Sequence, residues 1–447
     1  MTNLFGHSVR SELLALYVAE TLACFVVIYL LLAWGIAGAS PSSGGTIAAA
    51  AVLALGAGAV SGACGLYQPE AWSRANRLLL GTLIAGLLLL PLAWPALALL
   101  RPAPAEGASG RIAEILLAFA AVVVSTRLGF AAAVRSGVLC RRLAVIGGPG
   151  AVALKADPGE ARPEPFAVAL TLRPDGRLAE ALAPERLRAQ RIWAVLVADG
   201  ATLPEPVRRR CEAAGVRLFS EAEFRERRLS RVDLDRLGPG WLATARATRE
   251  GWLEAAIRRG FDIGLSLALL LLTLPLLLLT ALAIKLDSPG PVFYRQERVG
   301  RGGRVFTLYK FRSMVVDAEA NGAPCWASRG DPRVTRVGRL IRLTRIDEIP
   351  QALNVLRGDM AIVGPRPERP AFVEQLNRLI PHYRDRACVK PGITGWAQVN
   401  YPYGASVEDA RMKLAYDLYY VRRRSLFLDL LILIATVRVV LFQEGAR

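Results

Sequence analysis

The stretch FDIGLSLALLLLTLPLLLLTALAIKLDSPGP, residues 261–291, decides the fold class of this chain. Its apolar part, residues 263–284, is long enough to cross a bilayer, because about 20 helical residues at ~1.5 Å each span ~30 Å of hydrocarbon. Basic residues flank this run on both sides, and a long basic segment follows it. An ordinary span would carry that segment out of the cytoplasm, against the common distribution of Lys and Arg in membrane proteins.

Pro275 lies near the middle of this run. Proline has no N–H to donate and its ring collides with the carbonyl of Leu271, so we expect a kink there, with Thr273 available to bond a freed carbonyl. A helix broken at mid-depth can return to the face it entered, whereas a kinked span crosses. The residues alone leave both arrangements open.

Four further apolar runs precede this one, and each is close to the length of a membrane span. We expect four transmembrane helices within residues 1–136, with the N-terminus and the chain after residue 134 in the cytoplasm, because the connections there hold the arginines. Arg127 lies inside the fourth run, and we expect it either to reach the headgroups or to mark an early end of the span. The runs are 13–36, 46–66, 78–100 and 112–133.

The composition agrees with a membrane protein. The 447-residue chain is 53% hydrophobic and has a formal net charge of +18, which suits an anionic lipid surface or nucleic acid. The sequence contains no nucleic-acid-binding motif, so membrane lipid is an expected partner and nucleic acid is not. Its six cysteines are far apart and it has two isolated histidines, so neither a zinc site nor a disulfide framework is expected.

A small Rossmann-like α/β module is expected over residues 141–240, because strand-like and helical stretches alternate there. Gly147, Gly148 and Gly150 follow the first strand but depart from the GxGxxG pattern of dinucleotide sites. The module is therefore interpreted as structural or regulatory, and nucleotide binding stays open. The stretch 232–252, with its Gly and Pro, is expected to be a linker.

Three stretches beyond residue 290 together resemble one known family. They are similar to the bacterial sugar transferases, the polyprenyl-phosphate phosphoglycosyl transferases, and the chain as a whole resembles the large members with five hydrophobic segments. The stretches are YRQERVGRGGRVFTLYKFRSM (294–314), DPRVTRVGRLIRLTRIDEIPQALNVLRGDMAIVGPRPERP (331–370) and KPGITGWAQVN (390–400).

The resemblance implies transfer of a sugar 1-phosphate from a UDP-sugar to undecaprenyl phosphate, with release of UMP, at the start of exopolysaccharide, capsule or O-antigen synthesis. It also implies a re-entrant helix kinked at Pro275. The expected fold class is thus a multi-pass α+β protein of the bacterial inner membrane, in which residues 250–447 form that helix and a compact α/β catalytic domain at the cytoplasmic face.

The resemblance further implies a covalent intermediate on Asp317, with Glu319 as its partner and Mg²⁺ shared by both carboxylates. Oxygen ligands are the ones Mg²⁺ prefers, and nearby cations keep a carboxylate ionised. The family's small members have these acids adjacent, whereas Ala318 separates them here. Residues two apart face one way on a strand but nearly opposite ways on a helix, so the pairing stays open.

Cations are expected to hold the phosphates of both substrates, because arginine grips phosphate oxygens bidentately. The residues in matching motifs are Lys310, Arg312, Arg342 and Arg366. The adjacent acids Asp347 and Glu348 are expected to support the site by orienting arginines, and they are also the alternative catalytic pair.

Several questions stay open at this point. A rival reading is a membrane-bound nucleotide sensor or scaffold whose transferase domain is inactive. The transferred sugar is not specified, and the oligomeric state is open, with a homodimer through the membrane or α/β part as one allowed arrangement. The C-terminal apolar stretch, 421–442, is expected to lie at the membrane interface, with a core helix as the alternative.

Overall fold

The computed structural model divides into two compact units, one made mostly of residues 8–229 and the other of residues 230–447. Two short strands, β1 (Thr2–Leu4) and β2 (His7–Val9), come before the first helix. The residues described by the structure are 2–4, 7–9, 11–35, 44–68, 75–98, 108–147, 166–173, 178–198, 201–238, 240–245, 247, 250–316, 318, 331–402, 404 and 406–442.

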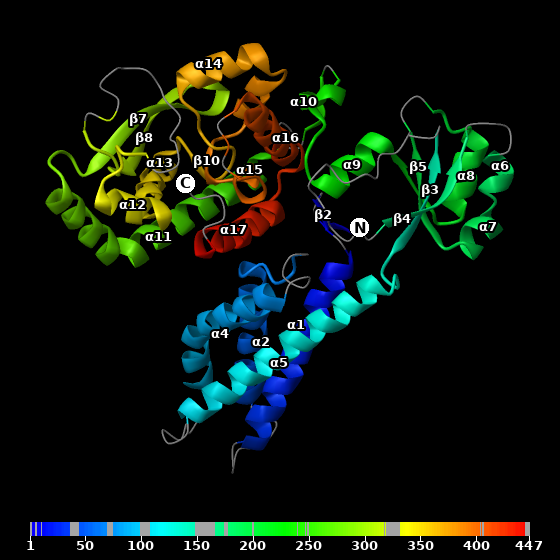
Figure 1. The fold of residues 1–447 in the computed structure, drawn as a ribbon, viewed down its shortest axis with the longest axis horizontal. Coiled ribbons are helices and arrows are strands. Elements are labelled where there is room, and N and C mark those ends of the chain that lie inside the picture. Colours follow the sequence, from blue (N-terminus) through cyan, green and yellow to red (C-terminus); the bar gives the residue numbers. More distant parts are fainter. Residues whose placement is uncertain are drawn as a thin grey trace. The chain divides into compact units, whose positions relative to one another are not determined.

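Four long apolar helices form the first part of the first unit: α1 (Ser11–Gly35), α2 (Gly44–Ala63), α4 (Ala75–Ala98) and α5 (Ala108–Arg135). α1 packs against α2 and α5, and α4 packs against the same two helices, so the four form a bundle (Figure 1). The buried residues of α2 are mostly Ala, Gly, Ser and Thr, which let membrane helices approach closely. These helices and α11 (Trp252–Asp287) are the five described helices long and apolar enough to cross a bilayer.

A buried ion pair joins α1 to α5 inside the bundle. Arg127 and Glu20 lie 2.6 Å apart with 0% and 1% of their side chains exposed. The Tyr67 hydroxyl donates to Glu20 Oε1 at 3.0 Å, and Arg127 Nε donates to the Leu66 carbonyl at 2.8 Å. The expectation that Arg127 reaches the headgroups or ends the span is therefore wrong, because α5 continues to Arg135 and pairing offsets the cost of a charge in hydrocarbon.

Arg141, the first residue of β3 (Arg141–Ile146), contacts the start of α1. Its Nε donates to Glu12 Oε1 at 2.5 Å, and its Nη2 donates to the Ser11 hydroxyl. Because Arg141 closely follows the end of α5, the first turn of α1 and the last turn of α5 lie at the same end of the bundle. A bundle of four helices that each run its full length brings the start of the first and the end of the last to the same side.

The rest of the first unit is a parallel α/β module, as the alternation of strands and helices predicts. β3, β4 (Phe166–Leu172), β5 (Ile192–Val197) and β6 (Arg217–Ser220) form one sheet in the order β4-β3-β5-β6. Helices cover both faces (Figure 1), with α6 (Leu178–Ala181), α7 (Pro184–Ala189) and α8 (Glu205–Ala213) on one and α9 (Glu221–Leu229) on the other. Gly148 and Gly150 of the expected glycine turn lie outside the described residues.

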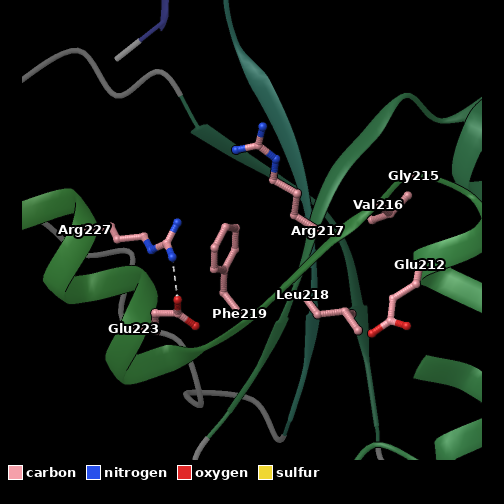
Figure 2. A pocket seen from close by; sticks show the side chains of 8 residues that line it. All are labelled: Glu212, Gly215, Val216, Arg217, Leu218, Phe219, Glu223 and Arg227. Atoms are coloured by element: carbon pink, nitrogen blue, oxygen red, sulfur yellow. Dashed lines mark hydrogen bonds and ion pairs between the residues drawn. The ribbon is translucent and has the colours of Figure 1, made fainter. Parts of the chain in front are cut away.

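A pocket of about 540 Å³ lies along β6, the edge strand of this sheet. Figure 2 shows its lining, to which Glu212, Arg217, Glu223 and Arg227 bring charges of both signs. Arg227 Nη2 donates to Glu223 Oε1 at 2.7 Å, and the Arg227 guanidinium lies over the ring of Phe219. Parallel α/β sheets place nucleotides at the carboxyl ends of their strands, so a pocket along an edge strand does not support nucleotide binding by the module.

The second unit holds two small sheets within a set of helices. β7 (Phe293–Val299) and β8 (Val305–Phe311) form an antiparallel hairpin, and β9 (Ala361–Val363) pairs in parallel with β10 (Gly392–Thr394). Its helices besides α11, with short 3₁₀ helices written η, are η1 (Leu234–Arg236), α10 (Trp241–Thr244), η3 (Arg301–Gly303), α12 (Arg336–Leu343), η4 (Ile346–Gln351), α13 (Ala352–Arg357), α14 (Pro370–Leu379), η5 (Tyr383–Cys388), α15 (Trp396–Asn400), α16 (Val407–Arg423) and α17 (Leu426–Leu441).

The stretch expected as a linker packs on the second unit instead. Val232, Leu234 and Trp241 are buried in its main hydrophobic cluster. The composition of this stretch does not indicate that it belongs to the core, because its buried apolar residues are separated by charged residues, Gly and Pro.

Both ends of α11 are fastened to the second unit (Figure 1). Near the start, Asp262 Oδ1 accepts the N–H of Ile362 at 3.0 Å; at the end, Asp287 Oδ2 accepts the N–H of Val337 at 3.1 Å. Many of the leucines between them are exposed. The helix runs through Pro275 as one element, and the Thr273 hydroxyl donates to Leu269 rather than to the Leu271 carbonyl that the proline leaves free.

The last helix, α17, packs against the main hydrophobic cluster. Leu428 and Ile432 are fully buried in the main cluster, and Arg424, just before it, pairs with Glu250 at 2.6 Å. One face of the helix is therefore built into the core, as the alternative predicts, and an interface position for the opposite face, with the exposed Leu430 and Val437, stays a prediction.

Candidate active site

Three charged side chains from separate segments of the second unit share one contact. Lys310, near the end of β8, donates from Nζ to Glu348 Oε1 at 2.8 Å. Arg366, in the loop after β9, donates from Nη2 to the same oxygen at 2.6 Å. Glu348 lies in η4 with 9% of its side chain exposed. We call Lys310, Glu348 and Arg366 the charge cluster; in it, the carboxylate orients the two cations.

Asn354, in α13, fixes β8 in this position. Its side chain is fully buried, its Oδ1 accepts the N–H of Tyr309 at 3.1 Å, and its Nδ2 donates to the carbonyl of Thr307 at 2.7 Å. The Asn354 amide thus pairs with the backbone of β8 as a neighbouring strand would. These bonds fix the strand at the residues that directly precede Lys310. Sequence reasoning misses Asn354, whose one signal is a polar residue on the apolar face of a short helix.

The loop that carries Arg366 is held through its backbone. Gly364 N–H donates to the Thr394 carbonyl at 2.9 Å. Arg386, in η5, donates from Nη2 to the Arg366 carbonyl at 2.9 Å and lies 2.7 Å from Asp417. Sequence reasoning misses Arg386 as well, because no local pattern tells which carbonyl an arginine faces.

Burial and neighbouring charge act differently on the two adjacent carboxylates. Burial raises the pKa of Asp347 to about 6, and Asp347 Oδ1 has no hydrogen-bond partner among the described residues. Burial acts the same way on Glu348, but the cations beside it, Arg366 foremost, outweigh burial and hold its pKa well below the ordinary value. Burial lowers the pKa of Lys310. Arg345 Nη1 also lies 3.9 Å from Glu348 Oε2, so Lys310, Arg345 and Arg366 face two adjacent carboxylates and the site keeps positive charge that a phosphate can use.

Comparison with known proteins relates the sequence that forms this site to one family. The model of the family described as bacterial sugar transferase matches residues 253–443. The chain is 46% identical over 238 residues to the UDP-N-acetylgalactosamine-undecaprenyl-phosphate N-acetylgalactosaminephosphotransferase of Aeromonas hydrophila, covering 53% of this chain and 55% of the relative. It is 42% identical over 190 residues to the exopolysaccharide production protein PSS of Rhizobium leguminosarum bv. phaseoli, covering 41% of this chain and 95% of the relative.

The chain belongs to the bacterial sugar transferase family. A further relative, the UDP-glucose:undecaprenyl-phosphate glucose-1-phosphate transferase of Escherichia coli (strain K12), is 46% identical over 183 residues, which is 40% of this chain and 39% of the relative. The match therefore spans about half or less of the Aeromonas and Escherichia relatives. In this sugar transferase the family match begins at the start of α11 and contains the whole charge cluster.

Arg312 of the sugar transferase closes the end of α11. Its guanidinium is buried and donates from Nη1 to the Pro289 carbonyl at 2.9 Å and from Nη2 to the Ser288 carbonyl at 2.6 Å. A Cβ at Gly290, where φ is +122°, would collide with Arg312 Nη1, so this turn requires glycine. In the structure Arg312 satisfies carbonyls at a helix end, and the phosphate-binding role stays a prediction.

Arg342 lies in α12, away from the contacts of the charge cluster. It is half-buried, and no ion pair joins it to a carboxylate within the part of the chain that the structure describes. A hydrogen bond from Arg333 and the nearby charge of Arg342 lower the pKa of Asp331 to about 2. Arg342 therefore lies near Asp331, where the described chain resumes after residue 318, and phosphate binding by Arg342 stays a prediction.

Asp317 and Glu319, the predicted nucleophile and its partner, lie outside the described residues. Between them, the Ala318 carbonyl accepts a hydrogen bond from Arg333 Nη1 at 2.9 Å, and Arg333 Nε donates to Asp331 Oδ1 at 2.8 Å. Arg333 thus ties the backbone beside the predicted nucleophile to Asp331. The pairing of the two carboxylates stays a prediction.

The described carboxylates do not fit Mg²⁺. Within the described ranges, no group of three or more His, Cys, Asp and Glu side chains could hold a metal ion. Glu348 already accepts two cationic donors, and Asp347 offers one free buried oxygen beside the cation of Lys310. The Mg²⁺ prediction therefore depends on Asp317 and Glu319.

Proposed function

We propose that this sugar transferase moves a sugar 1-phosphate from a UDP-sugar to undecaprenyl phosphate and releases UMP, as the first membrane step of exopolysaccharide, capsule or O-antigen synthesis. The observation that carries the proposal is the charge cluster, in which one oxygen of Glu348 holds both Lys310 and Arg366. Two cations fixed side by side offset the repulsion between two anionic substrates. The Aeromonas and Escherichia relatives are named for transfers of this class.

The chemistry proposed is two displacements at phosphorus. A carboxylate oxygen of Asp317 attacks the phosphorus that bears the sugar, forming an acyl phosphate bond as the bond to UMP breaks and its electron pair leaves with UMP. An oxygen of undecaprenyl phosphate then attacks the same phosphorus and returns the carboxylate. Splitting the transfer in this way lets UMP leave first, so the lipid phosphate meets a single phosphate group in place of the UDP-sugar diphosphate. Glu319 and Asp317 would hold Mg²⁺, which supplies positive charge to the phosphates.

The membrane arrangement proposed for α11 is re-entrant. Its start is fastened to Ile362 and its end to Val337, and both of these residues belong to the same compact unit. A helix whose two ends are bound to one water-facing domain leaves the membrane by the face it entered. The free carbonyl that Pro275 leaves at Leu271 gives the bend a place to form. We further propose that the second unit lies at the cytoplasmic face of the bacterial inner membrane.

The test is a screen of UDP-sugars for UMP formation by the full chain in nanodiscs, with undecaprenyl phosphate and Mg²⁺. We expect one sugar class to give turnover, and we expect Asp317→Ala to abolish it. The relatives are named for N-acetylgalactosamine and for glucose, so both belong in the screen. Folded protein that turns over no UDP-sugar would favour the rival function, a membrane-bound nucleotide sensor or scaffold.

A further inference from the structure

A short segment that precedes the family match is built into the core of the second unit. We call residues 230–238 and 240–245 the strap. The Val232 N–H donates to the Ala415 carbonyl of α16 at 3.0 Å, and Trp396 Nε1 donates to the Ser230 carbonyl at 2.8 Å. The strap residues buried in the main hydrophobic cluster are Val232, Leu234, Trp241 and Ala245. The strap is thus part of the transferase fold, although the family match begins only at residue 253.

Trp241 connects the strap to η5. Its side chain is 8% exposed, and its Nε1 donates to Asp385 Oδ2 at 2.8 Å. The same nitrogen lies 3.2 Å from His382 Nδ1, which is itself 2.9 Å from Asp385 Oδ2. His382 has φ +62°, a conformation that side chains other than glycine rarely adopt, so surrounding contacts must hold it. The indole N–H is one of these contacts.

From η5 the connection continues to the charge cluster. Arg386 follows Asp385 directly, and its Nη1 donates to the Tyr383 hydroxyl at 2.8 Å. Arg386 Nη2 donates to the Arg366 carbonyl at 2.9 Å, while the Arg366 side chain donates to Glu348 at 2.6 Å. A shift of η5 would therefore move the backbone from which the Arg366 guanidinium extends.

We propose that Trp241 is a positioning residue for the transferase reaction: the strap, through η5 and Arg386, sets where Arg366 meets the diphosphate of the UDP-sugar. This rests on the proposed function, because it takes Arg366 as a substrate-binding cation. Small displacements of substrate-binding groups are costly, since binding depends on their exact geometry. The strap thereby gives a segment outside the family match a part in substrate binding.

The experiment measures steady-state UMP formation by the full chain in nanodiscs, with the UDP-sugar found in the screen varied at saturating undecaprenyl phosphate. Trp241→Phe keeps an aromatic ring in the core and removes the N–H donor to Asp385. We expect KM for the UDP-sugar to rise about three- to ten-fold. A rise of this size corresponds to the loss of one hydrogen bond between Arg366 and the diphosphate. We expect kcat to stay within about two-fold, because the lost contact affects binding of the nucleotide sugar.

Trp396→Phe is the matched control. It also removes an indole donor that anchors the strap, but the acceptor is the Ser230 carbonyl, whereas the acceptor of Trp241 is Asp385 of η5. We expect it to lower Tm as Trp241→Phe does and to leave KM unchanged. An equal rise in KM in both variants would mean a general structural effect and would overturn the proposal.

A second variant tests the positioning role if Trp241→Phe does not fold. Asp385→Ala removes the same hydrogen bond by changing its acceptor, whose side chain is partly exposed, and an unchanged KM there would contradict the positioning role.

Arg366→Lys distinguishes failure of the positioning role from failure of the proposed function. A raised KM in Arg366→Lys beside an unchanged KM in Trp241→Phe removes only the positioning role, whereas an unchanged KM in both removes Arg366 from the proposed substrate site.

Discussion

Glu348 holds two cations at one oxygen, so neutralising it should leave Lys310 and Arg366 facing each other with only the charge of the neighbouring Asp347 to compensate them. We expect Glu348→Gln to abolish UMP formation and to lower the free energy of unfolding by about 2–3 kcal/mol. This is below the ~3–5 kcal/mol of a fully buried pair, because Arg366 is 33% exposed. Thermal unfolding in detergent and the UMP assay check the two effects.

The control for Glu348→Gln is Glu374→Gln in α14. Glu374 also pairs with an arginine, Arg378, but their side chains are 69% and 75% exposed. Exposed pairs contribute little, so Tm and activity should stay near those of the wild type. Similar losses in both variants would mean that the charge cluster has no special place in the fold or the reaction.

Asp347 should make stability depend on pH in the direction opposite to most carboxylates. Burial raises its pKa from 3.8 to about 6, so the folded state binds its proton more tightly than the unfolded state does. Stability is therefore lost as pH rises from about 4 through 6. We expect Asp347→Asn to raise Tm at pH 7 and to approach the wild type at pH 4, in thermal scans across that range. A Tm advantage that grows as pH falls would contradict this assignment.

For single residues, the sequence indicates which charged side chains belong to the site but not which groups they contact. Lys310, Glu348 and Arg366 stand in recognisable motifs, and the structure brings them together. Arg312 stands in an equally specific motif, yet its donors face carbonyls at the end of a helix. An arginine's partners depend on which backbone carbonyls the tertiary fold leaves free, and local sequence does not contain that information.

Among the elements, α11 depends on Arg312 for its end. Lysine keeps the charge but offers one nitrogen where the guanidinium reaches the carbonyls of both Ser288 and Pro289. We expect Arg312→Lys to lower the free energy of unfolding by about 1–3 kcal/mol, because part-buried carbonyls at the end of α11 lose a charged donor. Folded Arg312→Lys should retain its KM for the UDP-sugar.

Arg304→Lys is the comparison for this variant, because Arg304 is exposed in the turn of the β7–β8 hairpin. Its Tm should stay near that of the wild type. A KM rise without a change in Tm in Arg312→Lys would return Arg312 to the phosphate-binding role.

Element type was easier to predict than element packing. The long apolar runs predict the membrane helices because composition and length suffice for that inference. The strap was missed because Trp241 and Leu234 are separated by Gly and Pro, and no repeating pattern marks residues that are buried one at a time. The sequence of α17 does not decide between a core and an interface, because the apolar face of a core helix and that of an interfacial helix have the same pattern.

For the whole molecule, the re-entrant arrangement of α11 can be tested by labelling. Trp252→Cys and Arg304→Cys place exposed thiols at the first residue of this helix and beyond its end, in a background with the native cysteines replaced by alanine. We expect a membrane-impermeant maleimide to reach both positions only in inverted vesicles. Both sites should lie on one face, because the two ends of α11 are bound to one unit.

The reference position is Ala105→Cys, in the connection between α4 and α5, which the loop charges predict to lie outside the cytoplasm. It should react in right-side-out vesicles. Labelling of Trp252→Cys and Arg304→Cys from opposite sides would show that α11 crosses the membrane, and the cytoplasmic placement of the second unit would fail with it.

The ion pair between Glu20 and Arg127 has a consequence for how the protein is made. Glu20 emerges from the ribosome in the first helix, whereas its partner arrives only with the fourth, so the early bundle must shelter a lone carboxylate during synthesis. Helix α1 gains its full preference for the lipid phase when α5 joins it. Chains interrupted between the two should be recognised and degraded as unassembled membrane protein.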